Sequence, residues 1–180
     1  MAELNGTQAS LLGFLLEGPR TGWDLLEEIG RGLGRFWNLT PSHVYRELKA
    51  LEERGLIVAR EPGPRDRRPF AITRKGRGAF QTWIDEEPGA EQIRFPLLVS
   101  LWFGEQLDPR RLRQFVEARR RAHAERLARY REALAGVAQG DRHRAAVVQF
   151  GIRYEEAVLG WLDELAIEEP VRKPRARRRA

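Results

Sequence analysis

Apolar residues recur at intervals of three and four near the start of the chain, which is the spacing of a helix with one buried face. A first helix is predicted from an N-cap at Thr7 to about Glu17, where Gly18 and Pro19 follow. Its apolar stripe consists of Leu11, Leu12, Leu15 and Leu16. A second helix is predicted to begin at Thr21, with apolar positions at Trp23, Leu26 and Ile29.

The third predicted helix has the clearest start signal. Thr40 is a favourable N-cap, and Pro41 stands at the first helical position, where a missing N–H removes no hydrogen bond of the helix. Gly55 stands where a left-handed residue ends a helix. The apolar residues of its inner face are Val44, Leu48 and Leu51.

The hydrophobic period then changes from that of a helix to that of strands. Residues 56–59 read as a strand, residues 61–64 as a turn, and residues 70–72 as a returning strand. Thr73 can cap a further helix to about Glu86, whose apolar residues are Phe80, Trp83 and Ile84. Three helices, a two-stranded hairpin and a helix follow one another in this order in a winged helix domain.

The second half of the chain predicts a helical hairpin. A short linker at 87–92 precedes an apolar and aromatic segment at 95–103. A long helix is then expected from a cap at Asp108 to about Ala135, and a last helix from Asp141 to about Ile167. Two long amphipathic helices joined by a short loop predict antiparallel packing.

The fold class is therefore expected to be mainly α: a winged helix-turn-helix DNA-binding domain with a small two-stranded β wing, plus a C-terminal helical dimerisation domain. We place the first domain at residues 1–88, the second at 93–168 and a disordered basic tail at 169–180. The two-helix hairpin carries more apolar surface than it can bury against itself, so a partner surface is expected.

Charge changes the picture because it is concentrated in two places. The net charge of +6 equals the six basic residues of the last ten positions, so residues 1–170 are neutral overall. Within them, the segment 60–77 holds seven basic residues against Glu61 and Asp66. A local concentration of positive charge attracts phosphates more strongly than a high isoelectric point alone.

This charge lies where a winged helix meets DNA. The second helix of a helix-turn-helix presents its outer face to the major groove. The residues expected on that face are Ser42, His43, Tyr45, Arg46 and Lys49. The residues expected at the wing are Arg65, Arg67 and Arg68. Arginine can bond a guanine edge through two hydrogen bonds, and lysine can neutralise a phosphate. A solvated charged surface and a winged helix that binds protein remain alternatives from the residues alone.

The residues argue against an enzyme, a metal site and a cofactor. His43, His123 and His143 lack the spacing of metal ligands, and the chain has no cysteine. The acidic run 85–87 diverges around a helix end, so it cannot form an acid–base pair. Gly30, Gly32 and Gly34 follow a helix rather than a strand, unlike a phosphate-binding loop. No signal peptide or bilayer-spanning run is recognised, so a cytoplasmic location is expected.

The stretch from Leu11 to Gly78 resembles the PadR family of transcriptional regulators. The matching pieces are LLGFLLEGPRTGWDLLEEI at 11–29, Phe36-Trp37, TPSHVYRELKALEERGLI at 40–57 and RRPFAITRKGR at 67–77. FPLLVSLWFG at 95–104 and FGIRYEEAVLGWLDEL at 150–165 resemble the longer Vir/AphA-like C-terminal helical domain found in part of that family. Thr21 and Pro69 depart from the family pattern, and Pro69 predicts short or edge-like pairing of the wing.

The resemblance implies a homodimeric repressor that binds double-stranded DNA at a pseudo-palindromic operator. It also implies a candidate pocket for a small aromatic effector, whose residues would be Phe95, Leu98 and Trp102. Core packing is the alternative for these three residues. The basic tail is interpreted either as an arm that tracks DNA or as a solubilising terminus.

Overall fold

The computed structural model describes residues 3–37, 39–62, 68–91, 93–137 and 140–165. The chain divides into two compact units between Ala90 and Glu91, and each unit is described by itself. Arg65, Arg67 and the tail at 169–180 lie outside the described residues, so the expectations for them rest on the sequence.

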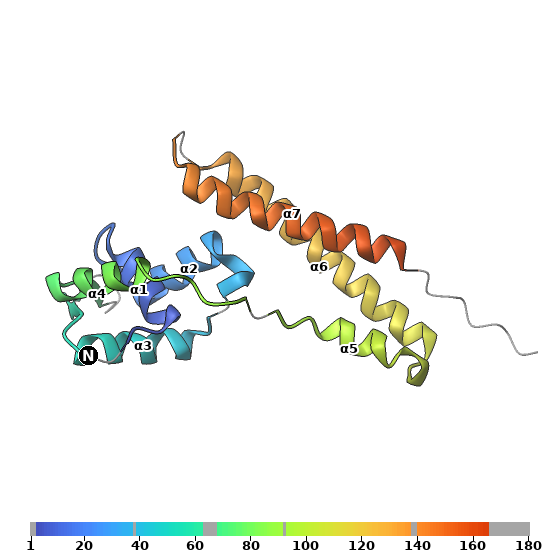
Figure 1. The fold of residues 1–180 in the computed structure, drawn as a ribbon, viewed down its shortest axis with the longest axis horizontal. Coiled ribbons are helices and arrows are strands. Elements are labelled where there is room, and N and C mark those ends of the chain that lie inside the picture. The colour runs from blue at the N-terminus through green and yellow to red at the C-terminus, as the bar shows by residue number, and fades with distance from the viewer. Residues whose placement is uncertain (1–2, 38, 63–67, 92, 138–139, 166–180) are drawn as a thin grey trace, which may run out of the picture. The chain divides into compact units, whose positions relative to one another are not determined.

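The first unit has the predicted order of three helices, a wing and a fourth helix (Figure 1). Its elements are α1 (Gly6–Leu15), β1 (Arg20–Thr21), α2 (Gly22–Gly32), the 3-10 turn η1 (Gly34–Trp37), α3 (Pro41–Glu53), β2 (Ile57–Ala59), β3 (Pro69–Ile72) and α4 (Arg74–Ile84).

Side-chain caps set the starts of these helices. The predicted N-caps Thr21, Thr40 and Thr73 are confirmed, since each side chain accepts a backbone N–H of the following turn. The prediction of Thr7 for α1 is wrong, because Asn5 caps this helix by accepting the Gln8 N–H at 2.8 Å. Both residue types are favourable caps, and the leucine stripe is compatible with either start.

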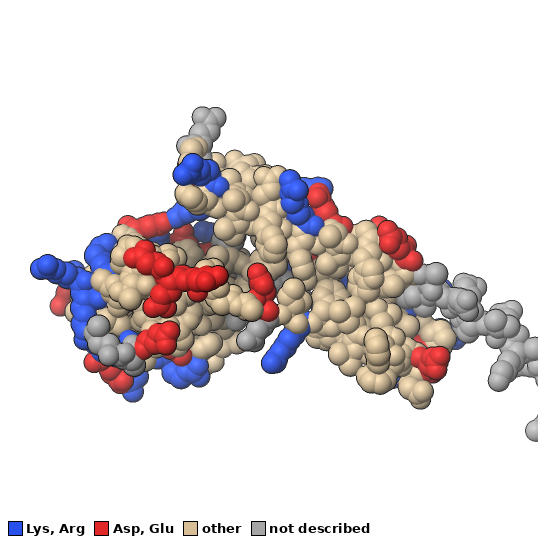
Figure 2. Space-filling model, viewed as in Figure 1, with Lys and Arg blue, Asp and Glu red and all other residues tan. Residues whose placement is uncertain are grey.

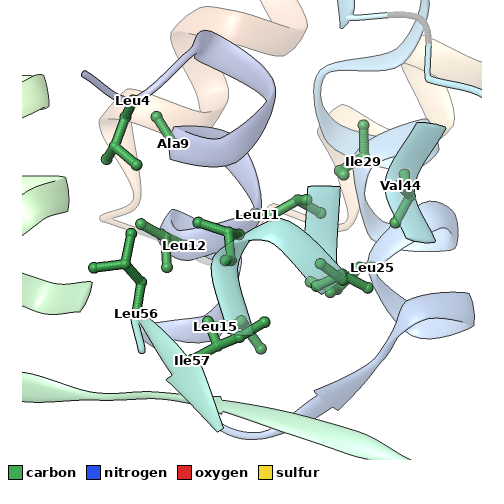
Figure 3. Packing of buried hydrophobic residues seen from close by; sticks show 12 residues of the cluster. Leu4, Ala9, Leu11, Leu12, Leu15, Leu25, Ile29, Val44, Leu56 and Ile57 are labelled. Carbon is green, nitrogen blue, oxygen red and sulfur yellow. The ribbon is translucent and has the colours of Figure 1, made fainter. Parts of the chain in front are cut away.

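The core of the first unit is formed by apolar side chains of α1, α2, α3 and the start of β2 (Figure 3). Val44, Leu48 and Leu51 of α3 are buried in it, as predicted. Trp23, predicted to face this core, is mostly exposed. The buried hydrophobic side chains of α2 are Leu25 and Ile29, four positions apart on one face, and this face is turned away from Trp23.

The wing belongs to a sheet of three strands rather than two, in the order β1-β3-β2. The third strand is the two-residue β1, in which Arg20 pairs with Phe70 and Thr21 with Pro69. Pro69 was expected to give short or edge-like pairing. The pairing is short, with two residues of β3 paired to β1 and three to β2, but β3 is the central strand rather than an edge. Pro69 is its first residue, and its carbonyl accepts a hydrogen bond from Arg60 N at 2.8 Å.

The second unit is a pair of long antiparallel helices preceded by a short one (Figure 1). Its elements are α5 (Pro96–Trp102), the 3-10 turn η3 (Gly104–Gln106), α6 (Pro109–Ala135) and α7 (Arg142–Glu164). Asp108 caps α6 as predicted, and Asp141, predicted as the start of the last helix, is the N-cap of α7. Helix α7 ends at Glu164, earlier than the predicted end near Ile167, and Ile167 itself lies outside the described residues.

Two apolar clusters hold α6 and α7 together. One contains the buried residues Leu97, Val116 and Leu162, and the other contains Tyr130, Val148 and Ile152. The Tyr130 ring lies so close to Gly151 that a Cβ there would approach the ring to 2.8 Å. The large Tyr130 side chain of α6 therefore fills the space beside the small Gly151 of α7.

Candidate nucleic-acid interface

Helix α3 separates an apolar inner face from a polar outer face. Val44 and Leu48 are buried in the core, which fixes the rotation of the helix about its axis. The outer face carries the five residues that the sequence places on the DNA-reading helix, namely Ser42, His43, Tyr45, Arg46 and Lys49. A cationic face held on a rigid, core-anchored helix is the geometry that major-groove recognition requires.

The two basic residues of this face extend furthest into solvent. The side chains of Arg46 and Lys49 are 70% and 79% exposed. The imidazole of His43 is partly covered, and the Ser42 hydroxyl lies 3.2 Å from that of Thr40 at the start of the helix. Arg46 and Lys49 are therefore the two side chains best placed for a base edge or a phosphate.

Tyr45 is held by the preceding helix. A Cβ at Gly22, the first residue of α2, would lie 2.6 Å from Cε1 of Tyr45 and 2.9 Å from its Cζ. The ring therefore rests against the backbone of α2, while half of Tyr45 remains exposed. This contact explains why a glycine stands at position 22, directly after the cap of α2.

A buried carboxylate lies beneath the outer face, and the sequence did not identify it. Glu47 is 8% exposed and accepts hydrogen bonds from Gln8 Nε2 at 2.9 Å and Asn5 Nδ2 at 3.3 Å. Burial alone would raise the pKa of Glu47, but the hydrogen bonds from Gln8, Asn5 and Arg46 and the charge of Arg46 outweigh it and hold the pKa below its usual value. The carboxylate is therefore ionised at neutral pH.

The wing contributes Arg68 to the exposed positive surface, just before β3. Not every basic residue between 60 and 77 adds to this exposed positive surface. Lys75 Nζ donates to the backbone carbonyl of Arg54 at 2.7 Å and so caps the C-terminal end of α3. On the side drawn in Figure 2, acidic side chains also lie among the basic ones, so the positive surface is local.

The three residues proposed for an effector pocket differ in burial. Phe95 packs into the second unit, where its ring stacks on His123 with centroids 5.9 Å apart and meets Trp161 edge-on at 5.8 Å. Leu98 and Trp102 lie on the surface of α5, and Trp102 is 85% exposed. Phe95 therefore packs in the core of this unit, which is the alternative that the sequence left open for it.

Phe95 covers a buried polar cluster that connects α6 to α7. The carboxylate of Glu155 lies against His123 Nδ1 and accepts a hydrogen bond from Arg126 Nε at 2.9 Å. Both His123 and Glu155 are fully buried. Spacing along one helix could not identify the carboxylate partner of His123, because Glu155 lies on the other helix, α7.

Among the described residues, no group of three or more metal-binding side chains could hold an ion. A search of the same part of the chain finds no helix with the length and apolar character needed to cross a bilayer.

Two family models match the chain in succession. Residues 11–82 match the PadR-like family of transcriptional regulators, and residues 93–168 match the virulence activator alpha C-terminal domain. A protein described as a probable transcriptional regulator of Mycobacterium tuberculosis is 29% identical over 180 residues, covering 87% of this chain and 94% of that protein. The negative transcriptional regulator PadR of Bacillus subtilis is 26% identical over 98 residues, covering 52% of this chain and 54% of that protein.

Solved structures show the same fold. B. subtilis PadR in complex with operator DNA superimposes with a TM-score of 0.72 at 20% identity, covering 88% of this chain and 96% of that chain. Its complex with p-coumaric acid gives 0.64 at 20% identity, covering 89% and 94%. The Vibrio cholerae virulence activator AphA gives 0.67 at 22% identity, covering 88% and 95%.

These likenesses confirm the predicted fold class, and the family consists of regulators rather than enzymes. The two family matches follow one another along the chain, and the division between its two compact units lies in the gap between them. The chain therefore belongs to the PadR-like family of DNA-binding transcriptional regulators, with a C-terminal domain of the virulence activator alpha type.

Proposed function

We propose that this regulator is a homodimeric repressor that acts in the cytoplasm and binds a pseudo-palindromic operator through α3 and the wing of each protomer. The observation that carries the proposal is the outer face of α3, where Arg46 and Lys49 extend into solvent above a fully buried apolar face. The relative from B. subtilis, named a negative regulator, supports repression rather than activation.

The residues of the interface divide into two roles. Arg46 is assigned to a guanine edge, since its planar fork fits the two acceptors of that base. Ser42, His43 and Tyr45 are assigned to bases or nearby phosphates. The phosphate contacts are assigned to Lys49 on α3 and to the wing residues Arg65, Arg67 and Arg68.

The second unit is proposed to form the dimer. Its α5 exposes Leu98, Val99 and Trp102, Phe103 is exposed directly after this helix, and α7 exposes Phe150. Monomers rarely expose several large apolar side chains on one short helix, so a second copy of the region 93–168 is the expected cover. Two-fold symmetry then gives each protomer of the 1–88 domain one half-site of a pseudo-palindrome.

Effector control extends this proposal. B. subtilis PadR has been crystallised with p-coumaric acid, so a small aromatic molecule is proposed to release this repressor. Leu98 and Trp102 are exposed in one protomer, and a partner could complete a pocket around them. Titration of p-coumaric acid and related phenols into the protein–operator complex tests this part, with loss of fluorescence anisotropy as the supporting result.

DNA binding is tested with the full chain and a labelled fragment from upstream of its own gene. About five phosphate contacts per protomer predict a slope near −9 for log affinity against log salt concentration in the dimer. Arg46→Ala should reduce the preference for this fragment over a scrambled one. Arg67→Ala with Arg68→Ala should weaken both fragments alike and flatten the slope.

Three results would contradict the proposal. These are a monomer in sedimentation at micromolar concentration, equal affinity for the two fragments, and a reporter that the protein does not repress. Removal of residues 169–180 separates the two roles considered for the tail, because a DNA-tracking arm would contribute to the salt slope and a solubilising terminus would not.

A further inference from the structure

An acidic residue on a helix that faces phosphates opposes DNA binding unless it has another task. Glu47 lies between Arg46 and Leu48 on α3, yet it is buried while Arg46 is exposed. A buried carboxylate must have hydrogen-bond partners, and those of Glu47 come from two directions.

One oxygen of Glu47 faces the protein interior. Its Oε2 accepts from Gln8 Nε2 at 2.9 Å and from Asn5 Nδ2 at 3.3 Å, and Asn5 is the N-cap of α1. The Oε1 atom of Gln8 accepts in turn from Arg54 Nη1 at 2.8 Å, at the C-terminal end of α3. These bonds fix the carboxylate relative to the start of α1 and, through Gln8, to the C-terminal end of α3.

The other oxygen faces two residues of the DNA-binding surface. Glu47 Oε1 lies 3.4 Å from Arg46 Nε and 3.3 Å from Arg46 Nη2, and it lies 3.4 Å from His43 Nε2. These contacts are longer than the usual distance of about 2.9 Å for a strong N–H···O bond, so a base edge can replace them at little cost. The oxygen restrains both side chains without blocking them.

We propose that Glu47 is a specificity-determining residue that positions the guanidinium of Arg46 and the imidazole of His43 before DNA arrives. The inference rests on the proposed role of α3 in reading bases. An unrestrained arginine side chain samples many rotamers and reaches any nearby phosphate, whereas a restrained one is ready for one base edge. The negative charge of Glu47 also weakens the attraction of this surface to phosphates. Non-specific DNA offers phosphate contacts without matching base contacts, so its affinity is lowered more than that of the operator.

The test is the ratio of affinities for the operator fragment and a scrambled fragment, measured with the full chain at one salt concentration. Glu47→Gln retains the shape of the side chain and removes its charge. The ratio should fall about five-fold or more, the range expected when one bidentate base contact loses its geometry. Affinity for the scrambled fragment should stay equal or rise, because a negative charge near phosphates has been removed.

A matched control is Glu53→Gln, the same charge change on the same helix. Glu53 is exposed and pairs with Lys49 at 3.8 Å, so its substitution should raise both affinities alike and leave their ratio unchanged. A purely structural role for Glu47 would instead lower the melting temperature and both affinities together. Circular dichroism on each variant shows which case holds.

A double-mutant cycle with Arg46→Ala separates the inference from the proposed function. Glu47→Gln should have no further effect on the ratio once Arg46 is absent, apart from any part that acts through His43. If Arg46→Ala lowers the affinity ratio but Glu47→Gln leaves it unchanged, the inference is overturned while the proposed function stands. An unchanged ratio for Arg46→Ala overturns the placement of α3 as the reading helix. Should Glu47→Gln fail to fold, Glu47→Asp keeps the charge but shortens its reach, and its ratio must also fall.

Discussion

The buried cluster of Glu155, His123 and Arg126 permits a quantitative prediction for the second unit. Glu155→Gln preserves the size of the side chain and removes its charge. The Arg126 guanidinium, 14% exposed, then loses its carboxylate partner on α7. Removal of one partner from a buried ion pair typically costs about 3–5 kcal/mol. Because Arg126 keeps some access to water, the lower end of about 3 kcal/mol is expected.

For a unit of this size, each kcal/mol lowers the melting temperature by about 4–8 °C, so a decrease of at least about 12 °C is expected. The assay is differential scanning calorimetry at one fixed protein concentration, since dimerisation makes the transition concentration-dependent. The first unit serves as an internal reference, because its core is separate and its transition should not move.

The matched control replaces the whole cluster rather than one member. The triple variant His123→Phe, Arg126→Met, Glu155→Leu removes every buried charge at once, and it should recover most of the lost stability. Two results would refute the reasoning. One is a Glu155→Gln melting temperature within about 2 °C of the wild type. The other is a triple variant no more stable than the single variant.

Three further predictions concern the first unit. Gly76→Ala should destabilise it by about 1–3 kcal/mol in urea unfolding, because the new Cβ would lie 2.1 Å from the backbone oxygen of Leu56; unchanged stability would contradict this packing. Gly22→Ala should displace the half-exposed Tyr45 ring, so operator affinity should fall more than the melting temperature does, whereas an equal loss of both would point to misfolding. The lowered pKa of Glu47 stabilises the fold above the usual value of 4.5, and this stabilisation is lost as the pH falls through the pKa of the folded state. Urea unfolding of Glu47→Gln should therefore depend less on pH below 4.5 than that of the wild type, and equal pH dependence would refute the assignment.

Elements with strong local signals were predictable from the sequence. Thr40 and Pro41 define the start of α3, and Gly55 follows its end with a left-handed φ of 68°. The spacing of Val44 and Leu48 alone fixes which face of α3 is buried. The same spacing therefore identifies the residues of the opposite face, Arg46 among them.

Features that depend on distant segments were not predictable in this way. A two-residue strand such as β1 has no hydrophobic period, and its pairing with β3 is visible only in three dimensions. Trp23 is apolar, but the burial of Leu25 and Ile29 in the core turns it outward. Glu47 resembles any charged residue of an exposed helix until Gln8, 39 positions earlier, is seen to donate to it.

The contact between Gly22 and Tyr45 makes two positions far apart in the chain dependent on each other during evolution. A side chain at position 22 and the present position of the Tyr45 ring are incompatible, so a larger residue at position 22 requires a displaced or smaller side chain at position 45. Position 45 lies on the outer face of α3, which is proposed to face DNA, so the start of α2 restricts which residues fit there. A change of DNA recognition at position 45 would then depend on position 22, whose glycine faces the tyrosine ring rather than DNA.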